Sequence, residues 1–245
     1  MENLINKIFP SKCMFCDTVG EILCEHCLSN CPLSQKQHCI VCDRPAKSGV
    51  THKKCFDKQK PTQFIHIYEY AGNVRKCINK SKYSSKRFMA LKTLSYEGSV
   101  LLSETGASFE GFAIVPIPLS NERAAQRGFN QAEVIAQKLS YVLKLKIENS
   151  ILTRTKKTIA QHKYGRRVRF ANVKGAFEAG AMGAQNRGVQ GRGVRGKKVL
   201  LVDDISTTGA TFLEAAKTLR EAGVKEVRCF ALSKKLKRGI VDHVS

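Results

Sequence analysis

Two adjacent carboxylates, Asp203 and Asp204, follow four apolar residues in the stretch VLLVDDISTTGAT. The loop behind them leads into a predicted helix, and its residues are Ser206, Thr207, Thr208, Gly209, Ala210 and Thr211. Hydroxyls and the free N–H groups of a helix N-terminus can hold a phosphate, and glycine lets the backbone approach the anion closely. A simple strand end and helix cap would need only one acid and one threonine. The stretch therefore predicts a site for ribose hydroxyls beside a 5′-phosphate.

A second group of chemically active residues lies near the N-terminus, where eight of the ten cysteines fall within residues 13–55. A CxxC turn presents two thiolates, and two such turns complete the tetrahedral shell that Zn²⁺ prefers. Because four protein ligands leave no open position, we expect structural rather than catalytic zinc. The spacing predicts a first site from Cys13, Cys16, Cys24 and Cys27 and a second from Cys39, Cys42, His52 and Cys55.

The pairing of these ligands stays open at this point. A crossed arrangement, in which the first two cysteines share a zinc with Cys39 and Cys42, fits the spacing as well. Residues 1–60 are too short to bury much of a core, so we expect a zinc ribbon-like module that is stabilised by metal. Such a module either docks nucleic acid or protein, or it is a metal-held structural cap.

The positive charge of the chain is large and uneven. The formal net charge is +22; residues 151–198 contain thirteen Lys/Arg and a single acid, and residues 72–92 contain seven Lys/Arg and none. Such concentration favours a basic surface for polyanions such as nucleic acid or phosphorylated small molecules. The alternative is two solvated segments that have no partner.

Apolar patterning over residues 61–245 alternates between strands and helices. The first predicted helix covers about 74–94 and the second follows Asn130 as a candidate N-cap. The third covers 211–223 and ends at Gly223. Cys77 and Cys229 are expected to be buried structural thiols. The predicted strands cover 64–70, 111–118, 197–204 and 227–232.

This alternation predicts an α/β domain with a mainly parallel sheet over residues 61–245. Residues of about 178–197 are rich in Gly and Arg and are expected to form a flexible loop. Gly191, Gly193 and Gly196 match a dinucleotide fingerprint, but they precede a strand instead of opening a helix, so we reject that interpretation. The first residues lack the apolar core of a secretory signal, and the apolar runs are shorter than the roughly 18 residues of a membrane span. We expect a cytoplasmic protein with no membrane span.

The apolar strand, the two acids and the Thr-Thr-Gly-x-Thr loop resemble the 5-phosphoribosyl 1-pyrophosphate (PRPP) loop of type I phosphoribosyltransferases. The stretches VPIPLSNERAAQRGFNQAEVIA and QHKYGRRVRFANVKGAF, together with the N-terminal CxxC pairs, resemble the ComF family, which is associated with competence for DNA uptake. The resemblance covers nearly the whole chain. It implies a type I phosphoribosyltransferase-like parallel sheet flanked by helices, with a small N-terminal zinc ribbon-like module.

The resemblance also implies roles for individual residues. Asp203 and Asp204 would hold the ribose 2′- and 3′-hydroxyls and help to place Mg²⁺ through water, and the residues from Ser206 to Thr211 would bind PRPP at its 5′-phosphate. If the site turns over, Mg²⁺-pyrophosphate would leave an oxocarbenium-like ribose carbon. The residues expected near the pyrophosphate are Arg123, Arg127, Gly128, Asn130 and Gln131, with Arg166 and Arg169 on a loop that covers the site.

Three functions are compatible with these features. The first is a competence protein that handles incoming single-stranded DNA, possesses a PRPP-binding domain and works with other DNA-uptake proteins. The second is an active phosphoribosyltransferase that acts on a nitrogenous acceptor. The third is a sensor that binds PRPP or a nucleotide without turnover. DNA binding would be chiefly electrostatic and independent of sequence, with Tyr83, Tyr164 and Phe170 as stacking candidates.

Overall fold

A computed structural model describes residues 11–236 except 82–84, 121, 123, 126–127, 156–165 and 181–192, and within its helices the side chains of 85–87 and 166–167 are also outside the described part. Its centre is a four-stranded, fully parallel sheet in the order β1-β6-β5-β2. The strands are β1 (Gln63–Glu69), β2 (Phe112–Pro116), β5 (Lys198–Ser206) and β6 (Glu226–Lys234). Their near-continuous apolar sequences fit this position, because both faces of the sheet are covered.

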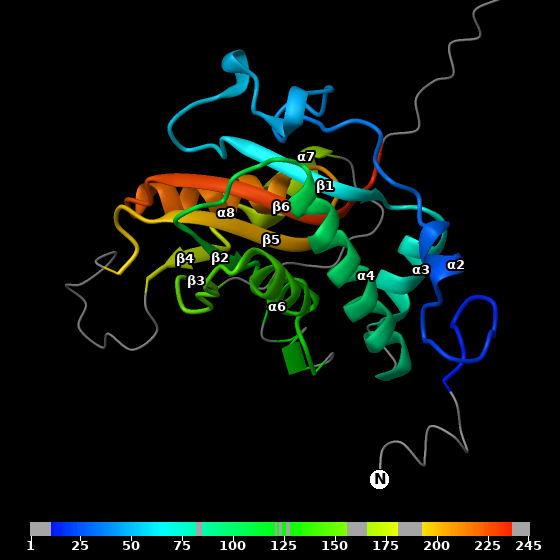
Figure 1. The fold of residues 1–245 in the computed structure, drawn as a ribbon. Coiled ribbons are helices and arrows are strands. Elements are labelled where there is room, and N and C mark those ends of the chain that lie inside the picture. The colour runs from blue at the N-terminus through cyan, green and yellow to red at the C-terminus, as the bar shows by residue number, and fades with distance from the viewer. Residues whose placement is uncertain are drawn as a thin grey trace, which may run out of the picture.

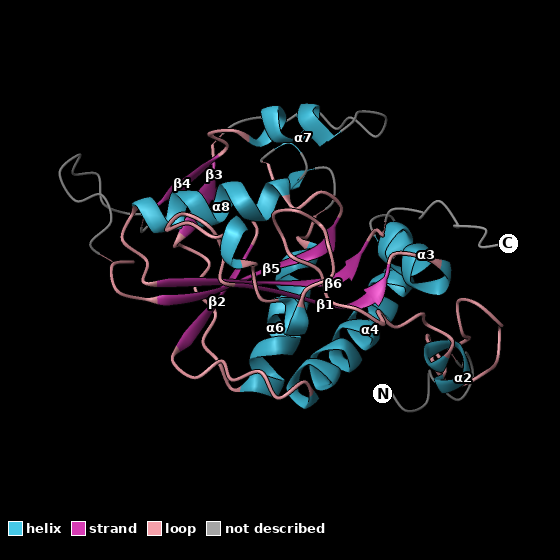
Figure 2. Cartoon of the chain, turned by 90° about the horizontal axis from the view of Figure 1, so that it is seen from above, coloured by secondary structure: helices cyan, strands magenta, loops and turns pink. Residues whose placement is uncertain are grey.

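Helices cover the two faces of the sheet (Figures 1 and 2). On one face α4 (Ser85–Glu104) packs beside α6 (Gln131–Leu143), and α3 (Gly72–Ser81) packs on α4. The opposite face holds α8 (Ala210–Glu221), with α7 (Arg166–Val173) against it. A small antiparallel sheet of β3 (Leu152–Arg154) and β4 (Phe177–Ala179) lies beside α8. The result is a parallel sheet between two helical layers, as the alternating pattern predicts.

Helix α4 differs most from the sequence-based prediction. The single helix expected over about 74–94 is wrong: α3 ends at Ser81, and α4 begins at Ser85 and continues to Glu104. The second half of α4 contains polar residues that the sequence pattern assigns to no buried face. Ser95 and Ser99 are fully buried and donate their hydroxyls to carbonyls one turn earlier, at 2.6 and 2.7 Å. A Cβ on Gly98 would lie 2.6 Å from Leu232, so small residues let this helix pack closely on the sheet.

Other local predictions are confirmed. Asn130 is the N-cap of α6 and accepts a hydrogen bond from the backbone N–H of Ala132. Gly223 follows the end of α8 with a positive φ of 94°. Cys77 and Cys229 are each only 1% exposed. None of the helices among the described residues is long and apolar enough to cross a membrane.

The predicted range of the Gly/Arg-rich loop, about 178–197, is too wide at both ends. Phe177–Ala179 form β4, and Val194 is 1% exposed. Residues 181–192 lie outside the described part of the chain.

The cysteine-rich N-terminal segment covers the free edge of β1. The side chain of Gln37 takes the place of a strand partner, because its Nε2 donates to the carbonyl of His66 and its Oε1 accepts from the N–H of His66, at 2.8 and 3.0 Å. Backbone hydrogen bonds flank this pair on both sides: Ser34 to Ile67, Glu69 to Pro32 and Thr51 to Thr62. An exposed sheet edge invites pairing with other chains, so the segment acts as a cap for the sheet.

Candidate functional site

The two aspartates lie near the carboxyl end of β5, a central strand of the sheet. Ligands of open parallel sheets bind at this edge. The backbone N–H of Asp204 donates to Oδ1 of Asp203 at 2.8 Å, which fixes the orientation of the Asp203 carboxylate. Both side chains are half-buried. They are adjacent, and therefore suited to binding a diol or a hydrated cation rather than to the separated acid and base roles of a glycosidase.

The electrostatics of this pair are unfavourable without a ligand. Burial, and then the neighbouring charge of Asp204, raise the pKa of Asp203 well above its usual value, while the charge of Arg154 opposes that rise. Arg154 ends β3, and its guanidinium carbon lies 5.4 Å from the centre of the Phe177 ring. The sequence pattern does not indicate Arg154, because a three-residue strand is too short to predict its place beside β5.

Tyr70 is a further neighbour that the sequence pattern did not indicate. Burial raises the pKa of its hydroxyl, and the charge of Asp204 contributes to that rise. The hydroxyl donates to Oδ1 of Asn79 at 2.7 Å. Tyr70 directly follows β1, so the carboxyl end of a second strand contributes to the same edge.

The loop from Ser206 to Thr211 joins β5 to α8. Thr207, Thr208 and Thr211 are partly exposed, and Oγ1 of Thr208 accepts from the backbone N–H of Ala210 at 3.4 Å. Ser206 differs, because its hydroxyl is buried and has no hydrogen-bond partner among the described residues. The loop thus presents threonine hydroxyls beside the start of a helix of 12 residues, which is the arrangement that favours an anion.

Gly209 brings this loop against the cysteine-rich segment. It is the N-cap of α8 with a φ of 76°, and a Cβ placed on it would lie 2.8 Å from the carbonyl oxygen of Ile40. A buried ion pair joins the cysteine-rich segment to β6, the strand beside β5: Nζ of Lys234, at the end of β6, lies 2.6 Å from Oδ1 of Asp43. The Lys234 side chain is only 3% exposed. The turn from Cys39 to Asp43, which we call the knuckle, therefore packs directly against the loop of the candidate site.

Of the remaining predicted site residues, some are buried in hydrogen bonds within the protein and others lie outside the described part of the chain. Asn130 is buried and donates its amide to the carbonyl of Ile117, just beyond β2. Gln131 is turned into the protein, and its amide donates to the carbonyl of Ile78 and to Oγ of Ser81. Gly128 has a φ of 69° in the loop before α6. Arg169 is half-buried in α7. Arg123, Arg127 and the side chain of Arg166 lie outside the described residues.

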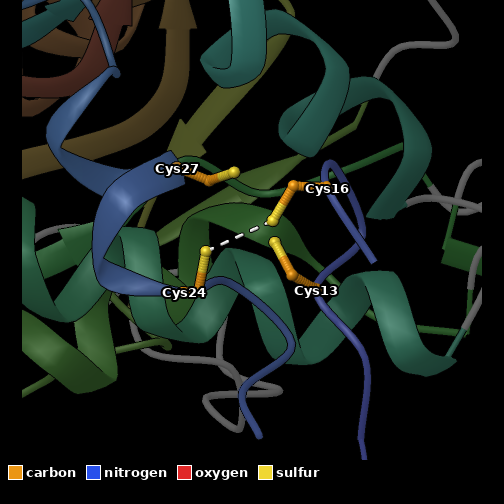
Figure 3. Close-up of side chains that lie close together, drawn as sticks. All are labelled: Cys13, Cys16, Cys24 and Cys27. Atoms are coloured by element: carbon orange, nitrogen blue, oxygen red, sulfur yellow. Dashed lines mark hydrogen bonds between the residues drawn. The ribbon is translucent and has the colours of Figure 1, made fainter. Parts of the chain in front are cut away.

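The first four-cysteine group comes together around α2 (Glu25–Ser29), as Figure 3 shows. The sulfurs of Cys13, Cys16, Cys24 and Cys27 all lie within 4.8 Å of one another, and those of Cys16 and Cys24 are 3.5 Å apart. Zn–S bonds of about 2.3 Å at tetrahedral angles place sulfurs about 3.8 Å apart, so the group fits Zn²⁺. Burial alone would raise the pKa of Cys13, but backbone hydrogen bonds lower it to about 6, whereas burial and the neighbouring cysteines raise the pKa of Cys27.

The second group has the same closeness with a histidine in it. The ligand atoms of Cys39, Cys42, His52 and Cys55 lie within 4.8 Å of one another. Nδ1 of His52 is 3.3 Å from the sulfur of Cys42, and Nε2 lies 3.0 Å from the carbonyl of Pro45. A histidine that binds metal through one nitrogen commonly donates the other N–H to a carbonyl, so this geometry also fits Zn²⁺. The two groups follow the predicted pairing and not the crossed one.

The sequence is similar to those of several known proteins. The family described as "Phosphoribosyl transferase domain" matches residues 125–243. Competence protein F of Haemophilus influenzae is 28% identical over 86% of this chain and 96% of its own length. The DNA utilization protein YhgH of Escherichia coli K12 is 30% identical over 87% and 91%. Competence protein ComFC of Streptococcus pneumoniae is 28% identical over 90% and 86%. These similarities extend across both the cysteine-rich segment and the sheet.

Proposed function

The chain belongs to the ComF family of competence and DNA-utilization proteins, and on that premise we propose that it binds PRPP and handles single-stranded DNA. The observation that carries the first part is the convergence of Asp203 and Asp204 with the threonine loop at one end of the sheet. The family relationship and the net charge of +22 support the second part. We further propose residues 1–60 as the metal-held module and 61–245 as the phosphoribosyltransferase-like domain.

The site residues divide the ligand between them. The carboxylates of Asp203 and Asp204 accept hydrogen bonds from the ribose hydroxyls, while Thr207, Thr208 and Thr211 donate to the 5′-phosphate together with backbone N–H groups at the start of α8. Arg154 lies close enough to Asp203 to influence its pKa, so it provides positive charge beside a pyrophosphate group. Asn130 holds the start of α6 against Ile117 and thereby positions the loop that precedes it.

The carboxylate pair also fits a divalent cation. Oxygen ligands and retained waters are what Mg²⁺ prefers, and a bound cation would relieve the repulsion that raises the pKa of Asp203. When bound, Mg²⁺ would neutralise the charge that develops on departing pyrophosphate. The residues of this chain hold the ribose and its phosphates in place for that step.

Binding without turnover and transfer to a nitrogenous acceptor remain two forms of this proposal. The knuckle of the second cysteine group packs against the threonine loop, and we place it at one wall of the site. An acceptor would have to fit against this wall, whereas a sensor would need only the PRPP side. Incubation with PRPP, Mg²⁺ and a panel of nucleobases, followed by pyrophosphate detection, separates the two: release that requires a base and is lost in Asp203→Asn/Asp204→Asn identifies an enzyme.

The DNA-binding part of the proposal has its own test. Affinity for single-stranded DNA is measured at two salt concentrations by fluorescence anisotropy. Binding that weakens steeply with salt and is indifferent to base sequence supports it, because phosphate contacts release counterions. A protein that does not bind at low salt contradicts it.

A further inference from the structure

Aromatic rings and lysines alternate along the seam between α4 and α6. Phe129, in the loop before α6, meets Phe88 of α4 edge-on with ring centres 4.7 Å apart. Nζ of Lys92 lies 4.7 Å from the centre of the Phe88 ring, one turn along α4. One turn further, the Tyr96 ring lies 6.4 Å from the Tyr141 ring of α6. These contacts connect residues from two helices that lie side by side in Figure 1.

The far end of this row is unusually exposed for aromatic residues. Tyr141 is 65% exposed and Tyr96 is 40% exposed, so neither ring is needed to fill the core. Lys144, which follows α6, places its Nζ 4.6 Å from the centre of the Tyr141 ring. Stacking between an aromatic ring and a cation holds both side chains at the surface in a defined position. We call the six residues the aromatic–lysine track: Phe129, Phe88, Lys92, Tyr96, Tyr141 and Lys144.

The near end of the track lies in the loop before α6. Phe129 lies between Gly128 and Asn130, two of the residues predicted to border the pyrophosphate. From Phe88 to Tyr96 the helix advances eight residues, or about 12 Å at 1.5 Å per residue. The near end is half-buried and forms the floor of the row, and the exposed tyrosines form the far end. The track therefore runs from the loop before α6 along one helical face of the protein.

We propose that this track is the binding surface for single-stranded DNA. Unpaired bases stack on aromatic rings, while lysines between the rings attract the backbone phosphates. Duplex DNA cannot use the rings in this way, because its bases are already stacked. A second copy of the chain would be the other occupant of such a surface, but the net charge of +22 opposes self-association and attracts a polyanion. The inference rests on the DNA-binding part of the proposed function and assigns it a surface.

The stacking candidates from the sequence contribute little to this assignment. Tyr83 and Tyr164 lie outside the described residues, and Phe170 is partly buried in α7. The two exposed tyrosines could not be paired from sequence, since they are 45 positions apart and meet only because α4 packs on α6.

The test compares variants of the full chain for binding of a fluorescein-labelled oligothymidylate, with the same length of duplex as a second probe. Tyr96→Ala/Tyr141→Ala removes the exposed rings, and Tyr96→Phe/Tyr141→Phe keeps them. Lys144→Glu reverses a track charge, and Lys217→Glu is its matched control, since Lys217 is exposed on α8 at the opposite face of the sheet. The chain has no tryptophan and six tyrosines, so the part of the tyrosine quenching by unlabelled oligonucleotide that is lost in Tyr96→Phe/Tyr141→Phe reports stacking on the two track rings.

The expected result is a loss of single-strand affinity of about fivefold or more per ring in the double alanine variant, and near-wild-type affinity in the double phenylalanine variant. Duplex affinity should change little. Lys144→Glu should weaken binding more than Lys217→Glu.

Binding of single-stranded DNA by the double alanine variant as tightly as by the wild type would contradict the track but leave the DNA-binding proposal standing. Equal losses of affinity in the two lysine variants would do the same. A wild-type chain that binds PRPP but no single-stranded DNA at low salt would instead remove the DNA-binding part of the proposed function, and the track with it. A change in oligomeric state on Tyr96→Ala/Tyr141→Ala without loss of DNA affinity would assign the surface to a second copy and contradict the inference.

Discussion

Gly209 of the threonine loop and Ile40 of the knuckle are in direct contact, and only a glycine fits at position 209. A Cβ at Gly209 would lie 2.8 Å from the carbonyl oxygen of Ile40 and 3.3 Å from two carbons of its side chain. Two segments that are 169 positions apart in the sequence thus meet at the threonine loop. The cysteine-rich segment therefore contacts the candidate site as well as capping the sheet.

Gly209→Ala should weaken PRPP binding because the methyl group pushes the loop away from the knuckle. Gly106→Ala is the matched control: Gly106 has nearly the same φ, 72° against 76°, but nothing lies within 4 Å of a Cβ placed on it. The left-handed conformation alone costs about 1–2 kcal/mol for a residue with a side chain, so both variants should lose that stability. Calorimetric titration with PRPP should show a loss in Gly209→Ala only. Equal affinities in the two variants would contradict the contact.

The two metal groups should differ in their effect on the site. Cys24→Ser and Cys55→Ser each remove one of four ligands, and each should lower the zinc content by one ion. The second group contains the knuckle, while the first packs with residues of α3 and α4. PRPP affinity should therefore fall in Cys55→Ser and persist in Cys24→Ser. Zinc is measured by atomic emission and PRPP binding by calorimetry. The opposite pattern of affinities would disprove this assignment.

The ion pair between Lys234 and Asp43 should matter more than its exposed counterpart on α8. The side chain of Lys234 is only 3% exposed, and Asp43→Ala removes the carboxylate that pairs with its ammonium. Breaking a buried pair in this way lowers the free energy of unfolding by about 3–5 kcal/mol. Glu221→Ala removes an exposed pair with Lys217, which contributes about 0–1 kcal/mol. Urea unfolding measures both changes. A loss in Asp43→Ala no larger than that in Glu221→Ala would show that the pair contributes little to docking of the knuckle.

Asp203→Asn should stabilise the unliganded protein at neutral pH although it damages the site. The pKa of Asp203 is raised in the folded state, so the ionised carboxylate is less stable in the folded protein than in the unfolded chain. The gain in stability from Asp203→Asn should be complete above the folded-state pKa of Asp203. It should disappear as the pH falls towards the pKa of Asp203 in the unfolded chain, because below that pH the wild-type carboxyl is protonated in both states. About 1 kcal/mol corresponds to a rise in Tm of about 2–4 °C for a protein of this size. Calorimetric scans across that pH range, without ligand, test it; a lower Tm at neutral pH would contradict the raised pKa.

Much of the sheet could be predicted because its strands carry the burial pattern within their own sequences. Val199, Leu200, Leu201 and Val202 are all fully buried in β5, as four consecutive apolar residues before two acids indicate. The two four-residue groups that could hold metal were predictable for a similar reason, since the CxxC turns and the His52-x2-Cys55 spacing are local features. Helix α4 was not, because its buried Ser95, Gly98 and Ser99 look like a polar surface until the neighbouring strands are known.

The placement of the cysteine-rich segment could not be read from the sequence. Gln37 and His66 pair through a side-chain amide and a backbone peptide, and residue patterns carry no signal for such a contact. The position of Gln131 was also beyond reach. The family motif suggests a ligand contact, whereas the structure gives its amide to Ile78 and Ser81 and so ties α6 to α3.

The central claim, that the end of β5 and the threonine loop bind a phosphoribosyl group, is tested most directly by calorimetric titration of the purified, zinc-loaded chain with PRPP and Mg²⁺. The wild type should bind with one site per chain, and Asp203→Asn/Asp204→Asn should lose most of that affinity while it remains folded. A wild-type chain that gives no heat of binding, or a double variant that binds PRPP as the wild type does, would contradict the claim.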